Sequence, residues 1–276
     1  MLFMSQQGEL EYLAPYAWGI VLGGILTVIV RVIYKEIAFR HDWVHFRKPL
    51  WYRSLSRKRK QILTSQFDFF HQLGKSDQKL LEHRTQQFIL QKNYVPRQLE
   101  KVTDEQKVLI AATACMLTLG RRNYNYGQVD HILVYPQPFV SVANEALHKG
   151  EFNPMQKAIV FSWPDFKEGY QVTNDNLNLG IHEFMHALHI EALNSTDVDS
   201  MRFEKYMKLI FVLLKSSKEM RERLLESKYF RDYAFSNGFE FMSVLAEYYY
   251  ESPEEFKERF PRIYFLMAKL FNFSLI

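Results

Sequence analysis

The chain of 276 residues contains a single cysteine, Cys115. One thiol excludes an intrachain disulfide framework and a zinc ribbon built from cysteines. The chain also lacks internal repeats and low-complexity tracts, and its 16% aromatic residues exclude an intrinsically disordered protein, because there is ample apolar surface to bury. We therefore expect one folded domain with an appendage, in which Cys115 is a small core residue rather than a reactive thiol.

Acidic residues are absent from segment 47–60, which contains seven basic residues. The net charge of the whole chain is +4, so the remainder of the chain is weakly acidic. A nucleic-acid-binding protein would spread its positive charge over a folded face. We therefore expect no direct contact with nucleic acid.

Charged residues are also absent from Tyr12 to Val30. As a helix this stretch would be about 28 Å long, close to the roughly 30 Å hydrocarbon core of a bilayer. A cleaved signal peptide has a basic start and a small-residue cleavage site, and neither is present here. A buried core helix is the other interpretation, but the basic residues that follow favour a membrane span. Aromatic residues lie toward both ends, as in interfacial belts: Tyr12, Tyr16, Trp18 and Tyr34.

The charge pattern divides the chain into four parts. We predict a short external tail at 1–11, a transmembrane helix at 12–33, a basic juxtamembrane segment at 34–60 and a folded domain at 61–276. The positive-inside rule places everything after the span in the cytoplasm. The basic segment would then lie against anionic lipid headgroups.

The pattern of apolar residues after the span predicts a helix-dominated α+β fold with a small sheet. Thr103 is expected to cap an almost wholly apolar helix that ends at Gly120. Segments 131–136 and 157–163 are short β-branched and aromatic runs, and we predict that they are strands. The remaining predicted helices are two short ones within 61–91, broken near Gly74, a long amphipathic one at 201–227, and two at about 236–250 and 253–273.

The motif that carries chemistry is H-E-x-x-H, from His182 to His186. Two histidines four positions apart lie on one face of a helix, so both imidazoles can bind one metal ion, and Glu183 then points toward the water that the metal activates. An Asn-rich cap at 174–176 is expected to begin this helix. Gly180 within it costs about 1 kcal/mol relative to alanine, which indicates close approach of another backbone or of substrate.

A catalytic zinc site needs a third protein ligand. The metzincin motif is excluded, because its glycine and its third histidine are replaced by His189 and Ala192. His189 lies about 10 Å along the helix axis from His182, so we expect it to have a structural or supporting role. Glu240 and Glu247 are acids in an otherwise apolar helix, and a buried carboxylate must be paired or bind a metal, so either can supply the ligand. Two weaker candidates are Glu191 and Glu204.

Several stretches together resemble the Mlc titration factor A (MtfA) family of zinc-dependent peptidases. These are gluzincin-type enzymes whose catalytic domain is similar to that of anthrax lethal factor. The matching stretches, spread over roughly residues 105–270, are VLIAATACMLTLG, HILVYPQPF, VFSWPDFKEGY, NLGIHEFMHALH and GFEFMSVLAEYYYESPEEFKERFPRIYFLM.

The resemblance implies a zincin-like metallopeptidase domain with one catalytic Zn²⁺ bound by His182, His186 and Glu240. It implies that Glu183 is the general base and that Tyr233 faces the zinc and stabilises the tetrahedral intermediate. A peptide or protein would be the substrate; aminopeptidase-like action is one option, and exo- versus endopeptidase action stays open. Strand 157–163 is a candidate edge for pairing with an extended peptide. The family does not require a membrane anchor, so the expected position of the domain on the cytoplasmic side of a bacterial inner membrane rests on the composition of the chain alone.

The chain departs from the family pattern in two places. Family members usually carry Asp where this chain has His189, followed by a Gly-containing loop where this chain has a longer charged segment at 195–230. A different class of function also stays open. In this alternative the protein is a membrane-tethered regulatory protein that captures a transcriptional regulator and keeps the zinc fold as a scaffold.

Overall fold

The computed structural model describes residues 2–41, 47–141, 145–171 and 175–276, and gives the backbone alone for residues 2–14 and Gln171. Asn174 and the side chain of Tyr12 therefore lie outside the described residues. The chain divides into a unit of residues 1–43 and a unit of residues 44–276.

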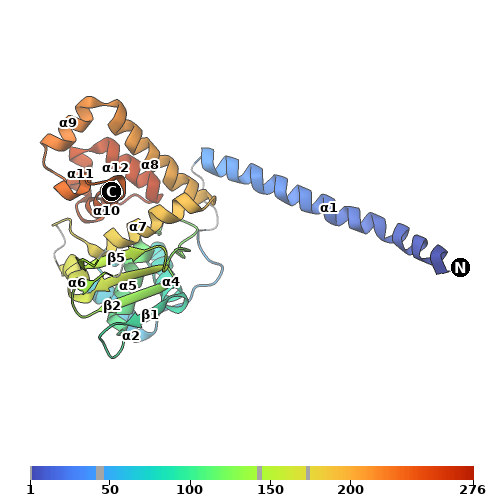
Figure 1. The fold of residues 1–276 in the computed structure, drawn as a ribbon, viewed down its shortest axis with the longest axis horizontal. Helices are drawn as coiled ribbons and strands as arrows, with labels where there is room; N and C mark the ends of the chain where they lie inside the picture. Colours follow the sequence, from blue (N-terminus) through green and yellow to red (C-terminus); the bar gives the residue numbers. More distant parts are fainter. Residues whose placement is uncertain (1, 42–46, 142–144, 172–174) are drawn as a thin grey trace. The chain divides into compact units, whose positions relative to one another are not determined.

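The first unit is one helix, α1 (Leu2–Arg40), with Pro15 inside it (Figure 1). From Pro15 to Arg40 it is long and apolar enough, by length and composition, to cross a membrane. The large apolar side chains along it are exposed; that of Ile20, for example, is 78% exposed. The helix therefore extends beyond the predicted span of 12–33 at both ends.

The second unit begins at Val44, earlier than the predicted domain start at residue 61. The reason is that the basic segment packs on the domain. Leu55 is buried in the core, and Arg47 forms an ion pair with Asp77 at 2.8 Å. Further ion pairs join Lys58 and Arg59 to Asp104, and Lys60 to Glu82. The described part of segment 47–60 is thus an integral part of the folded unit.

A four-stranded sheet lies beside the N-terminal helices of this unit (Figure 1). Its strand order is β1-β2-β6-β5, with β1, β2 and β6 parallel and β5 antiparallel to β6. The expectation that segment 157–163 forms an edge is wrong, because β6 lies between β2 and β5 and is buried at every residue. The edge strands are β1 and β5, and β5 is the one that packs against α7. The strands are β1 (Asn93–Pro96), β2 (His131–Tyr135), β5 (Gly150–Asn153) and β6 (Ala158–Ser162), with a separate hairpin of β3 (Phe139–Val140) and β4 (Leu147–His148).

Helices before and beside the sheet follow local sequence signals. Thr103 caps α5 through a capping box with Gln106, as predicted. Cys115 in α5 is fully buried, and this burial raises the pKa of its thiol to about 12, which confirms its core role. The helices are α2 (Arg57–Gln66), α3 (Phe69–Gln72), α4 (Lys75–Gln91), α5 (Asp104–Leu117) and α6 (Trp163–Gln171), with the expected break at Gly74.

The C-terminal helices are more broken than predicted. The single helix expected at 201–227 is two, because the Ser217 hydroxyl accepts the backbone N–H of Met220 and starts a new helix. Pro261 likewise divides the helix expected at 253–273, since proline fits the first turn of a helix but not its interior. The elements are α8 (Val198–Ser216), α9 (Lys218–Glu226), the 3₁₀ turn η1 (Asp232–Phe235), α10 (Gly238–Glu251), α11 (Pro253–Arg259) and α12 (Pro261–Phe271).

Helix α7 (Leu179–Asn194) runs between the sheet and the C-terminal helices, packing against α5, α8, α10 and β5 (Figure 1). Asn178 is its N-cap and accepts the backbone N–H of Ile181, so the helix begins later than the Asn-rich cap that we expected. A Cβ on Gly180 would lie 2.6 Å from the ring of Phe166, a side chain rather than another backbone or substrate. The central position of α7 places its polar residues between two layers.

Candidate metal centre

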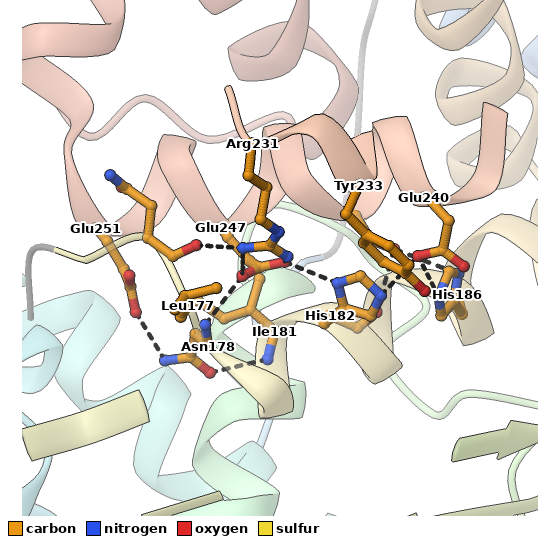
Figure 2. Close-up of polar contacts among 12 residues, drawn as sticks. Leu177, Asn178, Ile181, His182, His186, Arg231, Tyr233, Glu240, Glu247 and Glu251 are labelled. Atoms are coloured by element: carbon orange, nitrogen blue, oxygen red, sulfur yellow. Dashed lines mark hydrogen bonds and ion pairs between the residues drawn. The ribbon is translucent and has the colours of Figure 1, made fainter. Parts of the chain in front are cut away.

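Three side chains from two helices converge above α7 (Figure 2). His182 and His186 come from successive turns of α7, and Glu240 comes from the first turn of α10. One ligand atom from each lies within 4.8 Å of the others. The packing of α10 on α7 therefore brings together the three residues that the resemblance implied as metal ligands.

The spacing of these atoms fits a divalent metal ion. Glu240 Oε2 lies 2.9 Å from Nε2 of His182 and 3.5 Å from Nε2 of His186. Tetrahedral zinc bound at about 2.0–2.2 Å separates its ligand atoms by roughly 3.3–3.5 Å. Two imidazole nitrogens and one carboxylate oxygen are also a donor set that zinc prefers, so the residues present fit the ion.

The far side of His182 is held by Glu247. Its Oε1 lies 2.7 Å from Nδ1 of His182, and its side chain is 1% exposed. A carboxylate can only accept, so Nδ1 donates the hydrogen and Nε2 faces Glu240. Burial lowers the pKa of His182, but its hydrogen bonds to Glu240 and Glu247 prevail and raise that pKa to about 10. The same negative potential would attract a metal cation.

Arg231 holds Glu247 in turn (Figure 2). Its guanidinium donates to both carboxylate oxygens, at 2.6 and 2.9 Å, and also to the backbone carbonyl of Asn176. The backbone N–H of Asn178 donates a further hydrogen bond to Glu247 at 3.0 Å. The buried carboxylate is thus fully paired, as burial of a charge requires.

His186 is oriented by Ser243, one turn along α10 from Glu240. The Ser243 hydroxyl lies 3.3 Å from Nδ1 of His186 and donates to the backbone carbonyl of His182 at 3.2 Å. Because that hydroxyl hydrogen is used, Ser243 accepts from Nδ1 of His186. The lone pair on Nε2 of His186 is therefore directed at the candidate metal position.

Glu183 is buried beside this centre, 6% exposed, and lies next to the edge strand β5. A Cβ on Gly150 of β5 would lie 3.0 Å from Glu183 Oε1, so the strand passes close to the carboxylate. Burial raises the pKa of Glu183, against the opposing effect of the two imidazoles and a hydrogen bond from the backbone of Phe152. A carboxylate with a raised pKa next to a metal site is suited to accept a proton.

Tyr233 lies at the end of η1 nearest the centre, with its ring 6.0 Å from that of His182. Desolvation and the adjacent Glu240 carboxylate, to which the phenol is hydrogen-bonded, raise the pKa of Tyr233 to about 12. Its hydroxyl therefore stays protonated at neutral pH. Since the side chain is 54% exposed, it faces the open side of the site.

Among the described residues, the other candidates His189, Glu191 and Glu204 do not join the group. His189 stacks on Phe239, with ring centroids 4.2 Å apart, and burial lowers its pKa to about 4, so it packs as a neutral ring. Glu191 accepts hydrogen bonds from Asn123 and Gly127, and Glu204 pairs with Lys208. These contacts give all three residues structural roles.

Three supporting residues were missed by sequence reasoning: Arg231, Ser243 and Asn178. Ser243 could have been found, because it lies three positions after Glu240 on the same face of α10. Arg231 has no local signal, since it precedes a turn and reaches Glu247 only through the fold. A cavity of about 420 Å³ adjoins the centre and is lined by His182, Glu183, Arg231, Tyr233 and Gly150, among others.

Comparison with known proteins points to one family. The family model described as glucose-regulated metallo-peptidase M90 matches residues 42–272. An uncharacterized protein of Synechocystis sp. is 24% identical over 262 residues, which cover 90% of this chain and 95% of the relative. The Mlc titration factor A of Edwardsiella ictaluri is 25% identical over 219 residues, covering 72% of this chain and 82% of that protein. That of Escherichia coli O1:K1 is 25% identical over 209 residues, covering 70% and 77%.

Proposed function

The chain belongs to the glucose-regulated metallo-peptidase M90 family, and on this premise we propose that it is a zinc-dependent peptidase. The observation that carries the proposal is the convergence of His182, His186 and Glu240, whose ligand atoms lie within 4.8 Å of one another. A buried carboxylate, Glu183, lies directly beside them. Three metal ligands with an adjacent carboxylate are the residues that a hydrolytic zinc site with a general base requires.

His182, His186 and Glu240 would hold the zinc, which would supply Lewis acidity toward a peptide carbonyl and a water molecule. Glu183 accepts a proton from the attacking water, and its raised pKa suits it to pass the proton on to the leaving amine. Tyr233, protonated at neutral pH, donates a hydrogen bond to the oxyanion that develops on the carbonyl. Glu247 and Ser243 hold the two imidazoles in place meanwhile.

The substrate is proposed to be an extended peptide that pairs with β5. This strand is one of the two edge strands of the sheet, and it is the one that passes beside Glu183. Pairing there would hold the backbone of the peptide at a fixed height over the catalytic carboxylate. Aminopeptidase-like action is included in the proposal, and amino-acid arylamides would be the simplest substrates.

Placement at a membrane is the second part of the proposal. Helix α1 would span the bacterial inner membrane once, and the positive-inside rule would leave the catalytic unit in the cytoplasm. A cytoplasmic position agrees with the single buried cysteine.

The test is hydrolysis by the full-length protein purified in detergent. We expect chelator-sensitive cleavage of arylamides or of a peptide library. Glu183→Gln should keep its zinc and lose activity by roughly 10²–10⁴-fold, as expected for removal of a general base. Loss of zinc from Glu183→Gln would make Glu183 a ligand instead. Glu240→Ala should release the ion, and full retention of zinc would point to another acid.

A second candidate function is supported by the names of the relatives, which are called Mlc titration factor A. A protein of this kind could capture a transcriptional regulator and use the zinc fold as a scaffold. Capture of a regulator without turnover in the hydrolysis assay would favour this alternative over the peptidase.

A further inference from the structure

Two helices outside the metal centre present the same order of side chains on their outer faces. α8 and α12 pack together. On α8, Leu209 and Val212 are about one turn apart and lie between Lys208 and Lys215, and on α12 the adjacent residues Phe265 and Leu266 lie between Arg262 and Lys269. We call this surface the α8–α12 face; it comprises Lys208, Leu209, Val212 and Lys215 of α8 and Arg262, Phe265, Leu266 and Lys269 of α12.

The apolar part of the α8–α12 face is exposed. Leu209 is 42% exposed, Val212 58% and Phe265 57%. They line a groove of about 530 Å³ between the two helices, and no acidic residue lines it. Glu204 is the acid one turn away on α8, and it forms an ion pair with Lys208. The charge of Lys208 is thus compensated, and the positive charge beside the apolar residues comes from Lys215 on α8 and Arg262 on α12.

The point where the chain enters the second unit lies near the start of α8. Arg47 is the first described residue of that unit, and its carbonyl accepts from the buried Arg84 at 3.0 Å. Arg84 also donates to the carbonyl of Arg121, whose guanidinium reaches Ser200 in the first turn of α8. From Ser200 to Leu209 is only about 14 Å along a helix axis.

The connection to α1 is short. Helix α1 ends at Arg40, so six residues separate it from Arg47, and the seven steps from Arg40 to Arg47 can span at most about 25 Å. If α1 crosses a membrane, the covalent connection keeps the second unit in the vicinity of a lipid surface. The four basic residues of segment 47–60 that form ion pairs within the domain have their charges already compensated.

We propose that the α8–α12 face binds the surface of an anionic lipid membrane, in addition to the anchor that α1 provides. Leu209, Val212 and Phe265 enter the boundary between headgroups and acyl chains, and the flanking cations pair with lipid phosphates. This arrangement is that of an interfacial helix, with an apolar stripe and Lys or Arg beside it. The inference rests on α1 as a span and not on the peptidase activity.

The experiment uses the full chain reconstituted in vesicles. Cys115 is fully buried, so a cysteine introduced on the surface can be labelled selectively. Val212→Cys carries a bimane fluorophore, and vesicles of 7:3 phosphatidylcholine and phosphatidylglycerol contain lipids with a quencher on the acyl chain. The matched control is Met155→Cys, on the turn between β5 and β6 and 93% exposed.

We expect quenching of the label at position 212 to exceed that of the label at position 155 at least threefold. Adding Lys215→Glu and Arg262→Glu to Val212→Cys, or using vesicles of phosphatidylcholine alone, should remove most of that difference. Equal quenching at both positions in the anionic vesicles would overturn the proposal. Efficient disulfide formation between unlabelled Val212→Cys chains, without lipid quenching, would also overturn it and would make the face a contact between two copies.

Discussion

Glu247 Oε1 lies 2.7 Å from Nδ1 of His182, although 65 positions separate the two residues in the sequence. The Glu247 carboxylate is buried, and the Arg231 guanidinium donates hydrogen bonds to both of its oxygens. This contact keeps a hydrogen on Nδ1 of His182 and turns Nε2 toward Glu240.

Glu247→Gln is therefore expected to weaken zinc binding by roughly 10–100-fold, because a neutral amide polarises the imidazole less than a carboxylate does. Competition with a chromophoric chelator would measure the change. Glu251→Gln is the matched control, since Glu251 lies one turn further on α10 and contacts Asn178 rather than a histidine. Zinc affinity equal to that of the wild type in Glu247→Gln would refute the role of Glu247.

Tyr233→Phe should lower kcat/KM by roughly 10²-fold, within the range for removal of one oxyanion donor. The ring stays in place and the side chain is 54% exposed, so we expect neither zinc content nor the thermal midpoint to change. Steady-state kinetics on an arylamide would measure the effect. Unchanged kcat/KM would show that Tyr233 does not contact the reacting carbonyl.

Glu251 should make stability depend on pH. Burial raises its pKa to about 8, and its Oε2 is buried without a hydrogen-bond partner. Between the unfolded pKa near 4.5 and the folded pKa near 8, the folded state retains a proton that unfolding releases, so stability falls as the pH rises through this window.

Glu251→Gln should abolish this dependence, because the amide has no proton to release. We expect the variant to match the wild type in thermal midpoint at pH 5 and to exceed it by at least about 3 °C at pH 8.5. Thermal unfolding at the two pH values would measure the difference. A constant difference at both pH values would contradict the assignment.

Gly180→Ala should destabilise the domain by about 1–3 kcal/mol, although alanine is the better helix former by about 1 kcal/mol. The added methyl group would lie 2.6 Å from the ring of Phe166, which is itself fully buried and cannot move freely. Denaturant unfolding would measure the change. Gly127→Ala is the control, since nothing lies within 4 Å of a Cβ there, and equal stability of the two variants would show that Phe166 gives way.

Local patterns predicted much of the fold. The capping box at Thr103, the break at Gly74, the strands at His131–Tyr135 and Ala158–Ser162 and the two α7 histidines on one face all follow from interactions within a few residues. The helix breaks at Ser217 and Pro261 also have local causes, a serine cap and a proline. They were not predicted, because the apolar periodicity continues across both positions.

The sequence by itself determined three features: the pair of imidazoles from one helix, the carboxylate beside the first of them, and the apolar length of α1. These features depend only on helical periodicity and composition, which can be read from neighbouring residues. Only the tertiary structure decided that Glu240 turns toward the histidines while Glu247 supports one of them. It also decided that Arg231 pairs with Glu247 and that β6 lies inside the sheet, with β5 at the edge beside α7. These relationships depend on how α10 packs on α7 and on the order of strands in the sheet. Contacts between residues that are distant in the chain produce no regular spacing in the sequence, so the sequence pattern does not predict them.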